Sequence, residues 1–370
     1  MFKRFLVSVS AVVFTAYATV ASAFTVTDIE NRTVTFDREP SRFVLGNYVA
    51  NFMLVAGEAN LSKVVGMPGD GWEQTRKGEY RAFTKAYPVM KTMPSIGGYH
   101  DDVLNSEKIV SLKPDVLLVN RSQFQINRQK IDIFEKVGIK VVVLDYHAMK
   151  EANHVQSTKI LGQLLGRTAI ADALCNAYTS SIAEVKARIA KLPASELNKR
   201  AYFELGNLGA NQQGNSYAKD FLWGGILSAV KAQSLAHDMK APYAPLTREA
   251  VIAGNPQYIF IGGSIWENAH GSDQMRMGLT VDEAIANDRL KGFVKRPLWN
   301  TLDAVKNGHV YGLDHGSLRN IADWVFTVYI AKVLYPETFA DKDPLADYQA
   351  IFKQNLPTLD ISGTYMMKLH

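Results

Sequence analysis

Residues 168–192 read TAIADALCNAYTSSIAEVKARIAKL, and the apolar spacing of this stretch decides the fold. Its apolar side chains recur every three or four residues, which is typical of one face of an α-helix. They are Leu174, Tyr178, Ile182, Val185, Ile189 and Leu192. Pro193 and the polar residues up to Lys199 end the pattern. The sequence therefore predicts one long helix near the middle of the chain, and a shorter helical segment through residues 160–165 leads into it.

Short apolar runs lie on both sides of this helical region. They do not alternate with polar residues, so they favour strands that are buried on both faces, as in a parallel sheet covered by helices. The runs are 43–45, 64–65, 116–119 and 141–144 before the helix, and 201–205, 258–261 and 309–311 after it. Residues 24–36 do alternate, and they predict a small hairpin that turns at Glu30-Asn31-Arg32.

These patterns predict an α/β protein with two Rossmann-like lobes, each built on a central parallel sheet, joined by a single long α-helix. We assign residues 24–150 to the N-terminal lobe, 151–195 to the linking helical segment and 196–370 to the C-terminal lobe. The two lobes repeat a motif. Glu107 precedes Pro114 by seven residues and Glu249 precedes Pro256 by seven, and each motif runs through a predicted helix into a buried strand.

The N-terminus predicts export. Lys3 and Arg4 precede an apolar run from Phe5 to Val20, and Ala21-Ser22-Ala23 is a cleavage pattern, so residues 1–23 are predicted to be a signal peptide. A lipoprotein needs a cysteine at the cleavage point, but the only cysteine is Cys175. A single cysteine forms no internal disulfide. We expect a freely diffusing protein in the periplasm.

Size, charge and the absence of certain motifs limit the classes of protein to which this chain can belong. Cleavage leaves 347 of the 370 residues, which is more than one hydrophobic core normally serves, so two domains are expected. Loss of Lys3 and Arg4 lowers the formal charge from +5 to +3, which fits an anionic ligand. No polybasic run is present, so nucleic acid is not expected as a partner. No nucleophile elbow, phosphate-binding loop or zinc-protease motif is present either, so no catalytic residues or cofactor are expected.

The chain resembles the helix-linked (class III) periplasmic substrate-binding proteins of ABC importers, which take up ferric siderophores, haem, cobalamin and some metal ions or oxyanions. The matching segments keep their order and spacing over nearly the whole mature chain: 26–35, 40–44, 107–119, 161–166, 249–261 and 304–311. The resemblance implies a ligand cleft between the lobes, lined by loops at the carboxyl ends of the strands. It also implies that the linking helix permits only a modest hinge movement.

The loops that correspond to this cleft are rich in aromatic and basic side chains. Aromatic faces stack on flat ligands, and guanidinium groups pair with carboxylate or catecholate oxygens. We expect Arg121 and Arg319 to contact an anion. The full set of expected ligand-binding residues is Tyr48, Trp72, Tyr99, His100, Arg121, Tyr146, Tyr217, Trp266, His315 and Arg319. His100-Asp101-Asp102 is not expected to form a metal site, because adjacent residues rarely all face one ion. The aromatic and basic insertion at residues 67–96 is expected to form a lid.

A ferric siderophore is the favoured ligand, as the commonest cargo of this family. Haem, cobalamin and a small oxyanion such as molybdate are the alternatives, and a hydrolase using Asp314 and His315, or a sensor on the same fold, is the remote one. In cobalamin-binding members of the family, a glutamate in each lobe meets arginines on the two membrane subunits. The resemblance therefore implies that Glu107 and Glu249 dock on an ABC importer, and we expect the protein to act as a monomer.

Overall fold

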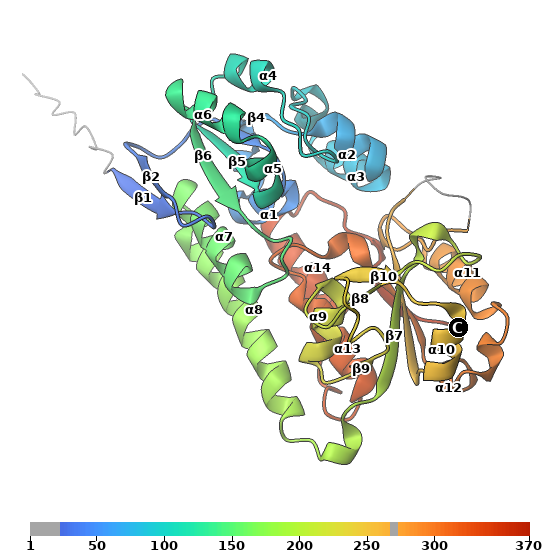
Figure 1. The fold of residues 1–370 in the computed structure, drawn as a ribbon. Helices are drawn as coiled ribbons and strands as arrows, with labels where there is room; N and C mark the ends of the chain where they lie inside the picture. The colour runs from blue at the N-terminus through green and yellow to red at the C-terminus, as the bar shows by residue number, and fades with distance from the viewer. Residues whose placement is uncertain (1–22, 267–272) are drawn as a thin grey trace, which may run out of the picture.

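The computed structural model describes residues 23–266 and 273–370, which form two α/β lobes with a pair of helices along one side (Figure 1). Apart from Ala23, the predicted signal peptide lies outside the described residues. Within those two ranges, no helix combines the length and the apolar character needed to cross a membrane.

The N-terminal lobe is built on a four-stranded parallel sheet in the order β4-β3-β5-β6. Its strands are β3 (Phe43–Leu45), β4 (Val64–Gly66), β5 (Val116–Asn120) and β6 (Lys140–Leu144). Neighbouring residues of a strand enter different cores: Leu118 belongs to the large core that runs through both lobes, whereas Leu117 and Val119 belong to a smaller core. Burial on both faces explains why these runs lack alternation, and the predicted parallel sheet is confirmed.

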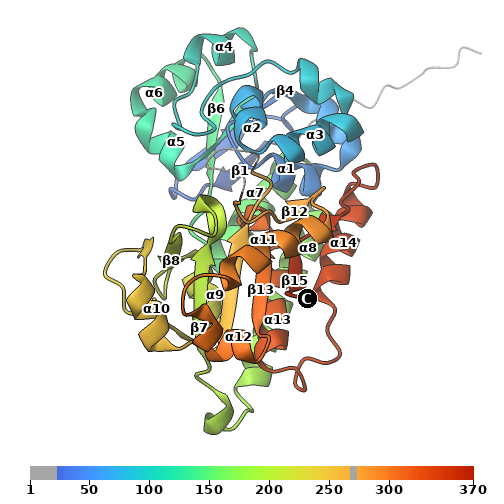
Figure 2. The ribbon, with the colours of Figure 1, turned by 90° about the vertical axis from the view of Figure 1, so that its right-hand side faces the viewer.

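A hairpin and six helices complete this lobe. The hairpin pairs β1 (Phe24–Thr27) with β2 (Thr33–Phe36), and Asn31 in its turn has a φ of 58°. The helices α2 and α3 form the long insertion and lie toward the C-terminal lobe (Figure 2). The helices of the lobe are α1 (Val49–Ala56), α2 (Gly69–Thr75), α3 (Lys77–Ala86), α4 (Ser106–Ser111), α5 (Arg121–Ile126) and α6 (Arg128–Lys136).

Two helices link the lobes. α7 (Glu151–Leu164) packs against α8 (Thr168–Ile189), which is the long helix that the sequence predicts. The side chains that α8 buries include Leu174, Tyr178, Ile182, Val185 and Ile189, whereas Leu192 lies beyond its end. At about 1.5 Å per residue, a helix of 22 residues spans about 33 Å. α7 and α8 therefore form a long helical connection that runs beside both lobes (Figure 1).

The C-terminal lobe is built on a five-stranded sheet in the order β15-β13-β11-β7-β9. The central strands are parallel, but the edge strand β15 runs antiparallel to β13, which the sequence did not predict. As in the first lobe, neighbouring residues point to opposite cores, with Phe260 in one and Ile259 and Ile261 in the other. The strands are β7 (Arg200–Leu205), β9 (Gln233–Ser234), β11 (Tyr258–Gly263), β13 (Val310–Asp314) and β15 (Met366–Lys368).

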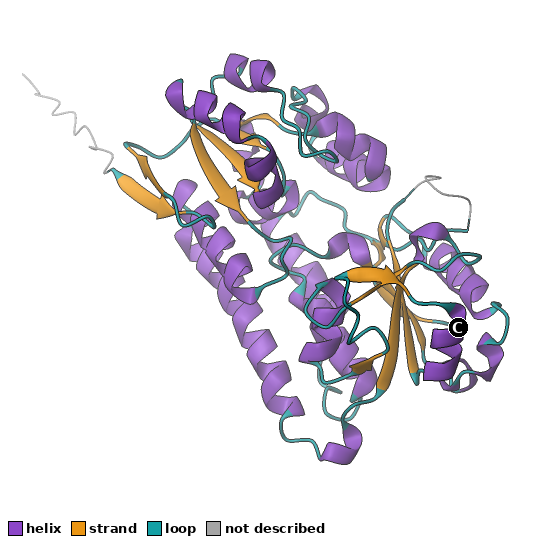
Figure 3. Ribbon diagram, viewed as in Figure 1, coloured by secondary structure: helices purple, strands orange, loops and turns teal. Residues whose placement is uncertain are grey.

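Helices cover both faces of this second sheet (Figure 3). They are α9 (Leu222–Ala229), α10 (Arg248–Gly254), α11 (Glu283–Val294), α12 (Asp303–Lys306), α13 (Trp324–Leu334) and α14 (Pro344–Asn355). Two small antiparallel pairs also lie in this lobe: β8 (Asn215–Tyr217) with β10 (Tyr243–Pro245), and β12 (Gly278–Leu279) with β14 (Gly363–Thr364). Short 3-10 turns occur at Glu58–Lys63, Pro88–Thr92, Ala194–Glu196, Gly206–Leu208, Trp299–Thr301 and His315–Ser317.

The C-terminal segment makes a second connection between the lobes. α14 contacts α1 of the N-terminal lobe. Just beyond α14, the backbone N–H and the hydroxyl of Thr358 donate hydrogen bonds of 2.6 and 2.8 Å to the carboxylate of Glu58. The chain then returns to the second sheet as β15. This path places the aromatic residues of the C-terminus beside the interlobe space.

Candidate functional site

A cavity of about 260 Å³ lies between the lobes, where loops follow the carboxyl ends of β3, β6 and β13. This is where ligands bind in open α/β sheets. The insertion helices α2 and α3 supply one wall, and the C-terminal segment supplies another. The polar and aromatic residues of the lining are Asn47, Tyr48, Asn51, Trp72, Arg76, Glu79, Phe83, Tyr99, His147, Asp314, Ser317, Arg319, Asn320, Tyr348, Phe352 and Tyr365.

Arg319 is the cation of the C-terminal lobe in this cavity. Its backbone has a φ of 69°, which is unusual for a residue with a side chain. The loop is held from both lobes: Asn51 of α1 donates to the Arg319 carbonyl and accepts from the N–H of Ile321, both at 3.0 Å. Asp323 accepts from the Arg319 N–H at 2.9 Å and lies 3.2 Å from Nε2 of His154 on α7. These contacts hold the backbone of Arg319 and do not use its guanidinium.

Arg76 is the cation of the N-terminal lobe, at the junction between α2 and α3. Its Nε lies 3.0 Å from Glu79, which also accepts a 2.7 Å hydrogen bond from the indole N–H of Trp72. Burial opposes the charge of Arg76, but Glu79, Tyr99 and Asp314 outweigh it and hold its pKa above the ordinary value. Arg76 therefore remains a cation facing the second lobe.

Asp314 is the last residue of β13 and interacts electrostatically with Arg76. Burial raises the pKa of its carboxyl to about 6, although Arg76 and hydrogen bonds from Ser317 and Gly316 oppose the rise. The hydroxyl of Ser317 donates at 2.5 Å and the backbone N–H of Gly316 donates at 2.9 Å. The site consequently holds a carboxyl group that titrates near neutral pH.

Tyr48 and His147 form the polar edge of the cavity on the N-terminal lobe. The Tyr48 hydroxyl accepts from the N–H of Tyr146 at 3.1 Å and lies 2.7 Å from Nδ1 of His147. Burial keeps the phenol protonated by raising its pKa. Burial, helped by the nearby charge of Arg319, lowers the pKa of His147 to about 4. His147 is therefore neutral at physiological pH.

His315 packs against aromatic residues of the C-terminal lobe. The indole N–H of Trp223 donates to its Nδ1 at 2.9 Å, and Tyr217 stacks on its ring. Its Nε2 lies 3.3 Å from a terminal nitrogen of Arg319. Burial raises the pKa of Tyr217 to about 12, so its phenol also stays neutral.

The structure brings six of the ten expected ligand-binding residues to this region. Tyr48, Trp72, Tyr99 and Arg319 line the cavity itself. His315 lies against Arg319, and Tyr217 lies against His315. The predicted insertion also contributes one wall, through α2 and α3.

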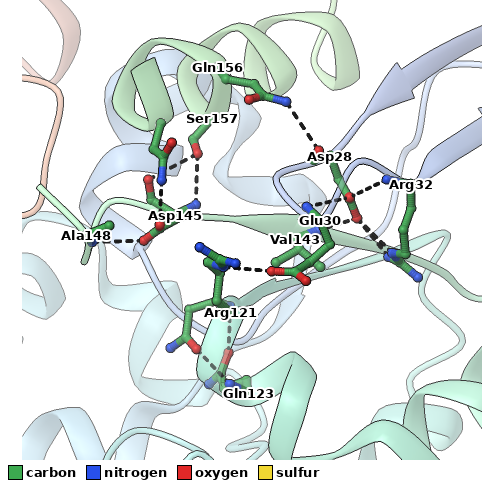
Figure 4. A network of polar contacts seen from close by, with 12 residues as sticks. Asp28, Glu30, Arg32, Arg121, Gln123, Val143, Asp145, Ala148, Gln156 and Ser157 are labelled. Carbon is green, nitrogen blue, oxygen red and sulfur yellow. Dashed lines mark hydrogen bonds and ion pairs between the residues drawn. The ribbon is translucent and has the colours of Figure 1, made fainter. Parts of the chain in front are cut away.

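Four expected residues lie elsewhere. Arg121 begins α5 and points to the hairpin, where its Nε lies 2.7 Å from Glu30 (Figure 4). His100 is an exposed residue bonded to Thr75. Tyr146 is fully buried and hydrogen-bonded to Thr158 at 2.9 Å. Trp266 packs on the main core.

The contribution of the C-terminus was not predicted from the sequence. Tyr348 and Phe352 of α14 and Tyr365 before β15 all line the cavity. No helix was predicted there, and the four-residue spacing of Tyr348 and Phe352 gives no direction toward the cleft. Glu79 was also missed, although it lies in the insertion that was predicted to be a lid.

Metal ligands do not gather in the described part of the chain. No group of three or more His, Cys, Asp or Glu side chains there could hold a metal ion. The predicted residues that line the cavity supply hydrogen-bonding groups, a cation and aromatic walls: Tyr48, Trp72, Tyr99 and Arg319.

Comparison with known proteins agrees with this architecture. The family profile of the periplasmic binding proteins matches residues 72–315. The chain belongs to this family. This periplasmic binding protein is 24% identical over 323 residues to an uncharacterised ABC transporter substrate-binding lipoprotein, YvrC, of Bacillus subtilis, covering 86% of this chain and 87% of that one. It is 27% identical over 221 residues to the iron-uptake system-binding protein of the same organism, covering 56% and 57%.

A solved structure shares the whole fold. The TroA-like periplasmic binding protein FepB from Veillonella parvula is 28% identical, with a TM-score of 0.87 over 94% of this chain and 99% of that one. The predicted helix-linked fold is thus confirmed. The periplasmic binding protein described here is the substrate-binding component of an ABC transporter and not an enzyme.

Proposed function

We propose that this binding protein captures an anionic, oxygen-rich metal chelate, with a ferric siderophore as the leading class, and delivers it to an inner-membrane ABC importer. We propose further that it is exported by cleavage after residue 23 and acts as a monomer. The observation that best supports an anionic ligand is the position of the Arg319 side chain. Its guanidinium reaches the interlobe cavity and, among the described residues, forms no ion pair with a carboxylate.

Two further features support this ligand class. Arg76 adds a second cation from the opposite lobe, so a ligand with spread negative charge can contact both. The phenols of Tyr48, Tyr99, Tyr348 and Tyr365 surround the same cavity and supply both hydrogen-bond donors and aromatic surface. The similarity to an iron-uptake binding protein favours iron as the metal of the chelate.

The size of the cavity favours a compact ligand. Its volume of about 260 Å³ is at the lower end of the range for small-molecule sites, which is about 300–1,000 Å³. A compact carboxylate chelate or a free oxyanion fits this space better than haem or cobalamin. The larger ligands require the lobes to move apart, and contacts such as Asn51 with Ile321 oppose that motion.

Native mass spectrometry and absorbance of the protein purified from its own periplasm test this proposal. We expect one ligand per chain, with the mass of an iron chelate and a visible charge-transfer band. Added ferric chelates are expected to quench tryptophan fluorescence, because Trp72 lines the cavity. A co-purified haem or corrinoid, or steady release of an altered ligand, contradicts the proposal.

Two exposed glutamates support the proposed delivery step. Glu107 and Glu249 are exposed and occupy the second position of α4 and α10. The side chains of Asn105 and Thr247 cap these helices by accepting from the N–H three residues later. The glutamates are therefore not needed as caps, and we propose that they contact the membrane subunits.

A further inference from the structure

His315 lies between an indole and a guanidinium, and both neighbours can only donate hydrogen bonds. Its Nδ1 is 2.9 Å from the indole nitrogen of Trp223, and its Nε2 is 3.3 Å from a terminal nitrogen of Arg319. An indole N–H cannot accept, so Nδ1 must be the unprotonated nitrogen of the ring. In a neutral imidazole the proton then lies on Nε2, facing Arg319.

The surroundings keep this ring neutral and fixed. Burial lowers the pKa of His315 well below its ordinary value, and the charges of Arg319 and Arg76 lower it further. Tyr217 stacks on the ring at 6.2 Å with 14° between the planes. Trp223 in turn stacks on Phe203 at 4.7 Å. His315 therefore presents one N–H donor in a set direction.

This N–H and the guanidinium of Arg319 face each other as two donors, and within residues 23–266 and 273–370 no carboxylate accepts a hydrogen bond from that guanidinium. Asp323, which lies nearby, accepts from the backbone N–H of Arg319 instead. We propose that the ligand places an unprotonated, negatively charged oxygen against both donors, and that Trp223 makes His315 a hydrogen-bond donor to that oxygen rather than a ligand of a metal. The inference rests on the proposed function, because it takes the interlobe cavity as the binding site.

A metal at His315 conflicts with the same geometry. Coordination through Nε2 requires the ring proton on Nδ1, where it faces the donor of Trp223. Two donors in buried contact leave both hydrogen bonds unmade, which is unfavourable. The oxygen can belong either to a free oxyanion or to a carboxylate of a metal chelate, since both accept hydrogen bonds from Arg and His.

Nitrogen NMR of the mature protein labelled with ¹⁵N-histidine reads the tautomer directly. We expect His315 to show an unprotonated Nδ1 and a protonated Nε2 from about pH 5.5 to pH 8, a range in which an ordinary histidine titrates. The signals are assigned by their loss in His315→Gln. A protonated Nδ1 in the wild type overturns the role given to Trp223.

Two matched variants test the oxygen contact with sodium molybdate and gallium(III) citrate, a diamagnetic stand-in for a ferric chelate. His315→Gln places an amide N–H near the position of Nε2, so we expect affinity within about threefold of wild type. His315→Asn replaces only Nδ1, and we expect a loss of about tenfold or more, as for a hydrogen bond to a charged group. Thermal unfolding of each variant checks that the fold is intact.

The outcomes separate the two levels of the proposal. Binding of molybdate alone identifies a free oxyanion, and binding of gallium citrate alone identifies a chelate. Equal affinity of wild type and His315→Asn, or a change of tautomer on loading, overturns the oxygen contact. If neither probe binds the wild type, the proposed ligand class and the oxygen contact both fail, while the spectrum of the unloaded protein still decides the role of Trp223.

Discussion

Arg319 has an unusual positive φ, and its guanidinium forms no ion pair with a carboxylate in the part of the chain that the structure describes. Its backbone N–H and carbonyl are used by Asp323 and Asn51, so the guanidinium is left to the cavity. Burial lowers the pKa of Arg319. A buried cation is stabilised when an anion arrives, and the free energy of that pairing becomes binding free energy.

We expect Arg319→Ala to weaken binding of a ferric carboxylate chelate by about 1.5–3 kcal/mol, the usual worth of a charge-assisted hydrogen bond. Arg319→Lys should lose less, because it keeps the charge but not the two-pronged geometry. Both variants share the same positive φ, so the backbone effect cancels between them. Titration calorimetry measures the affinities.

Arg121→Ala is the matched control for this experiment. Arg121 is also a basic residue just after a strand, but it pairs with Glu30 outside the cavity. Its removal should leave affinity unchanged. Equal affinity for wild type and Arg319→Ala would remove Arg319 from the site.

The difference between these two arginines shows how far the end of a strand predicts the position of the side chain that follows it. Both follow a recognisable strand, but Asn120 and Gln123 form a capping box that starts α5 at once and turns Arg121 toward the hairpin. Arg319 instead follows a 3-10 turn, whose path leads into the cleft. Strand runs could be read from the sequence because they are continuous and apolar. The direction of a side chain after a strand depends on such local hydrogen bonds, which the apolar pattern of the strand does not encode.

The raised pKa of Asp314 predicts that the free energy of unfolding depends on pH. Burial raises the pKa of its carboxyl from 3.8 to about 6 in the folded state. Between these values the folded protein binds more protons than the unfolded chain, so the free energy of unfolding falls as pH rises from about 4 to about 6. The whole loss is about 3 kcal/mol at most.

We expect Asp314→Asn to remove this loss. Its free energy of unfolding relative to wild type should increase between about pH 4.5 and pH 7.5, as measured by urea denaturation, because the amide does not titrate. The exposed Asp238 serves as a control, and Asp238→Asn should show no such trend. A constant difference between Asp314→Asn and wild type across this range argues against the raised pKa.

At the scale of elements, residue type separates what the sequence predicted from what it did not. α8 and the parallel strands other than β9 were predicted because their residues form periodic or continuous apolar patterns. Each strand of the pairs β8–β10 and β12–β14 contains polar, glycine or proline residues, and the edge strand β15 has no β-branched or aromatic residue, so none of them reads as a buried strand. Their pairing is decided by the surrounding chain: for example, the backbone N–H of Asp314 in β13 donates a 2.7 Å hydrogen bond to the carbonyl of Tyr365, just before β15.

α1 holds the loop of Arg319 through one residue, Asn51. Its amide makes two hydrogen bonds of 3.0 Å across the lobe boundary, and it is buried. Asn51→Ala leaves a buried carbonyl and a buried N–H without partners, which costs about 1–3 kcal/mol each. We therefore expect a lower free energy of unfolding. We also expect the loop of Arg319 to be less well positioned, which lowers the affinity for the same ferric chelate.

Asn60→Ala is the matched control for this element. The amide of Asn60 donates only to the carbonyl of Ala56, within the N-terminal lobe. We expect it to change stability little and ligand affinity not at all. An Asn51→Ala protein with wild-type affinity would mean that the loop is positioned without α1.

At the scale of the molecule, the two lobes carry one exposed glutamate each at the same place in a repeated helix–strand unit. α4 and α10 both begin with a capping side chain, then a polar residue, then the glutamate. A carboxylate in the first helical turn is stabilised by the helix dipole, but only by about 0.3–1 kcal/mol at an exposed site. Duplication on two lobes, far from the cavity lining, suits a partner with two equivalent subunits.

We expect Glu107→Arg combined with Glu249→Arg to abolish uptake in cells that lack the native protein, because the two proposed contacts with cationic groups of the membrane subunits become repulsive. Ligand affinity in solution should stay near wild type, since neither residue lines the cavity. Glu196→Arg with Glu337→Arg makes the same charge change at two other exposed positions and should leave uptake intact. Growth on the chelate as sole iron source, together with immunoblots of periplasmic protein, measures the effect. Uptake at the wild-type rate by the first double variant means that docking uses another surface. Loss of the folded protein means instead that the glutamates stabilise the helices α4 and α10.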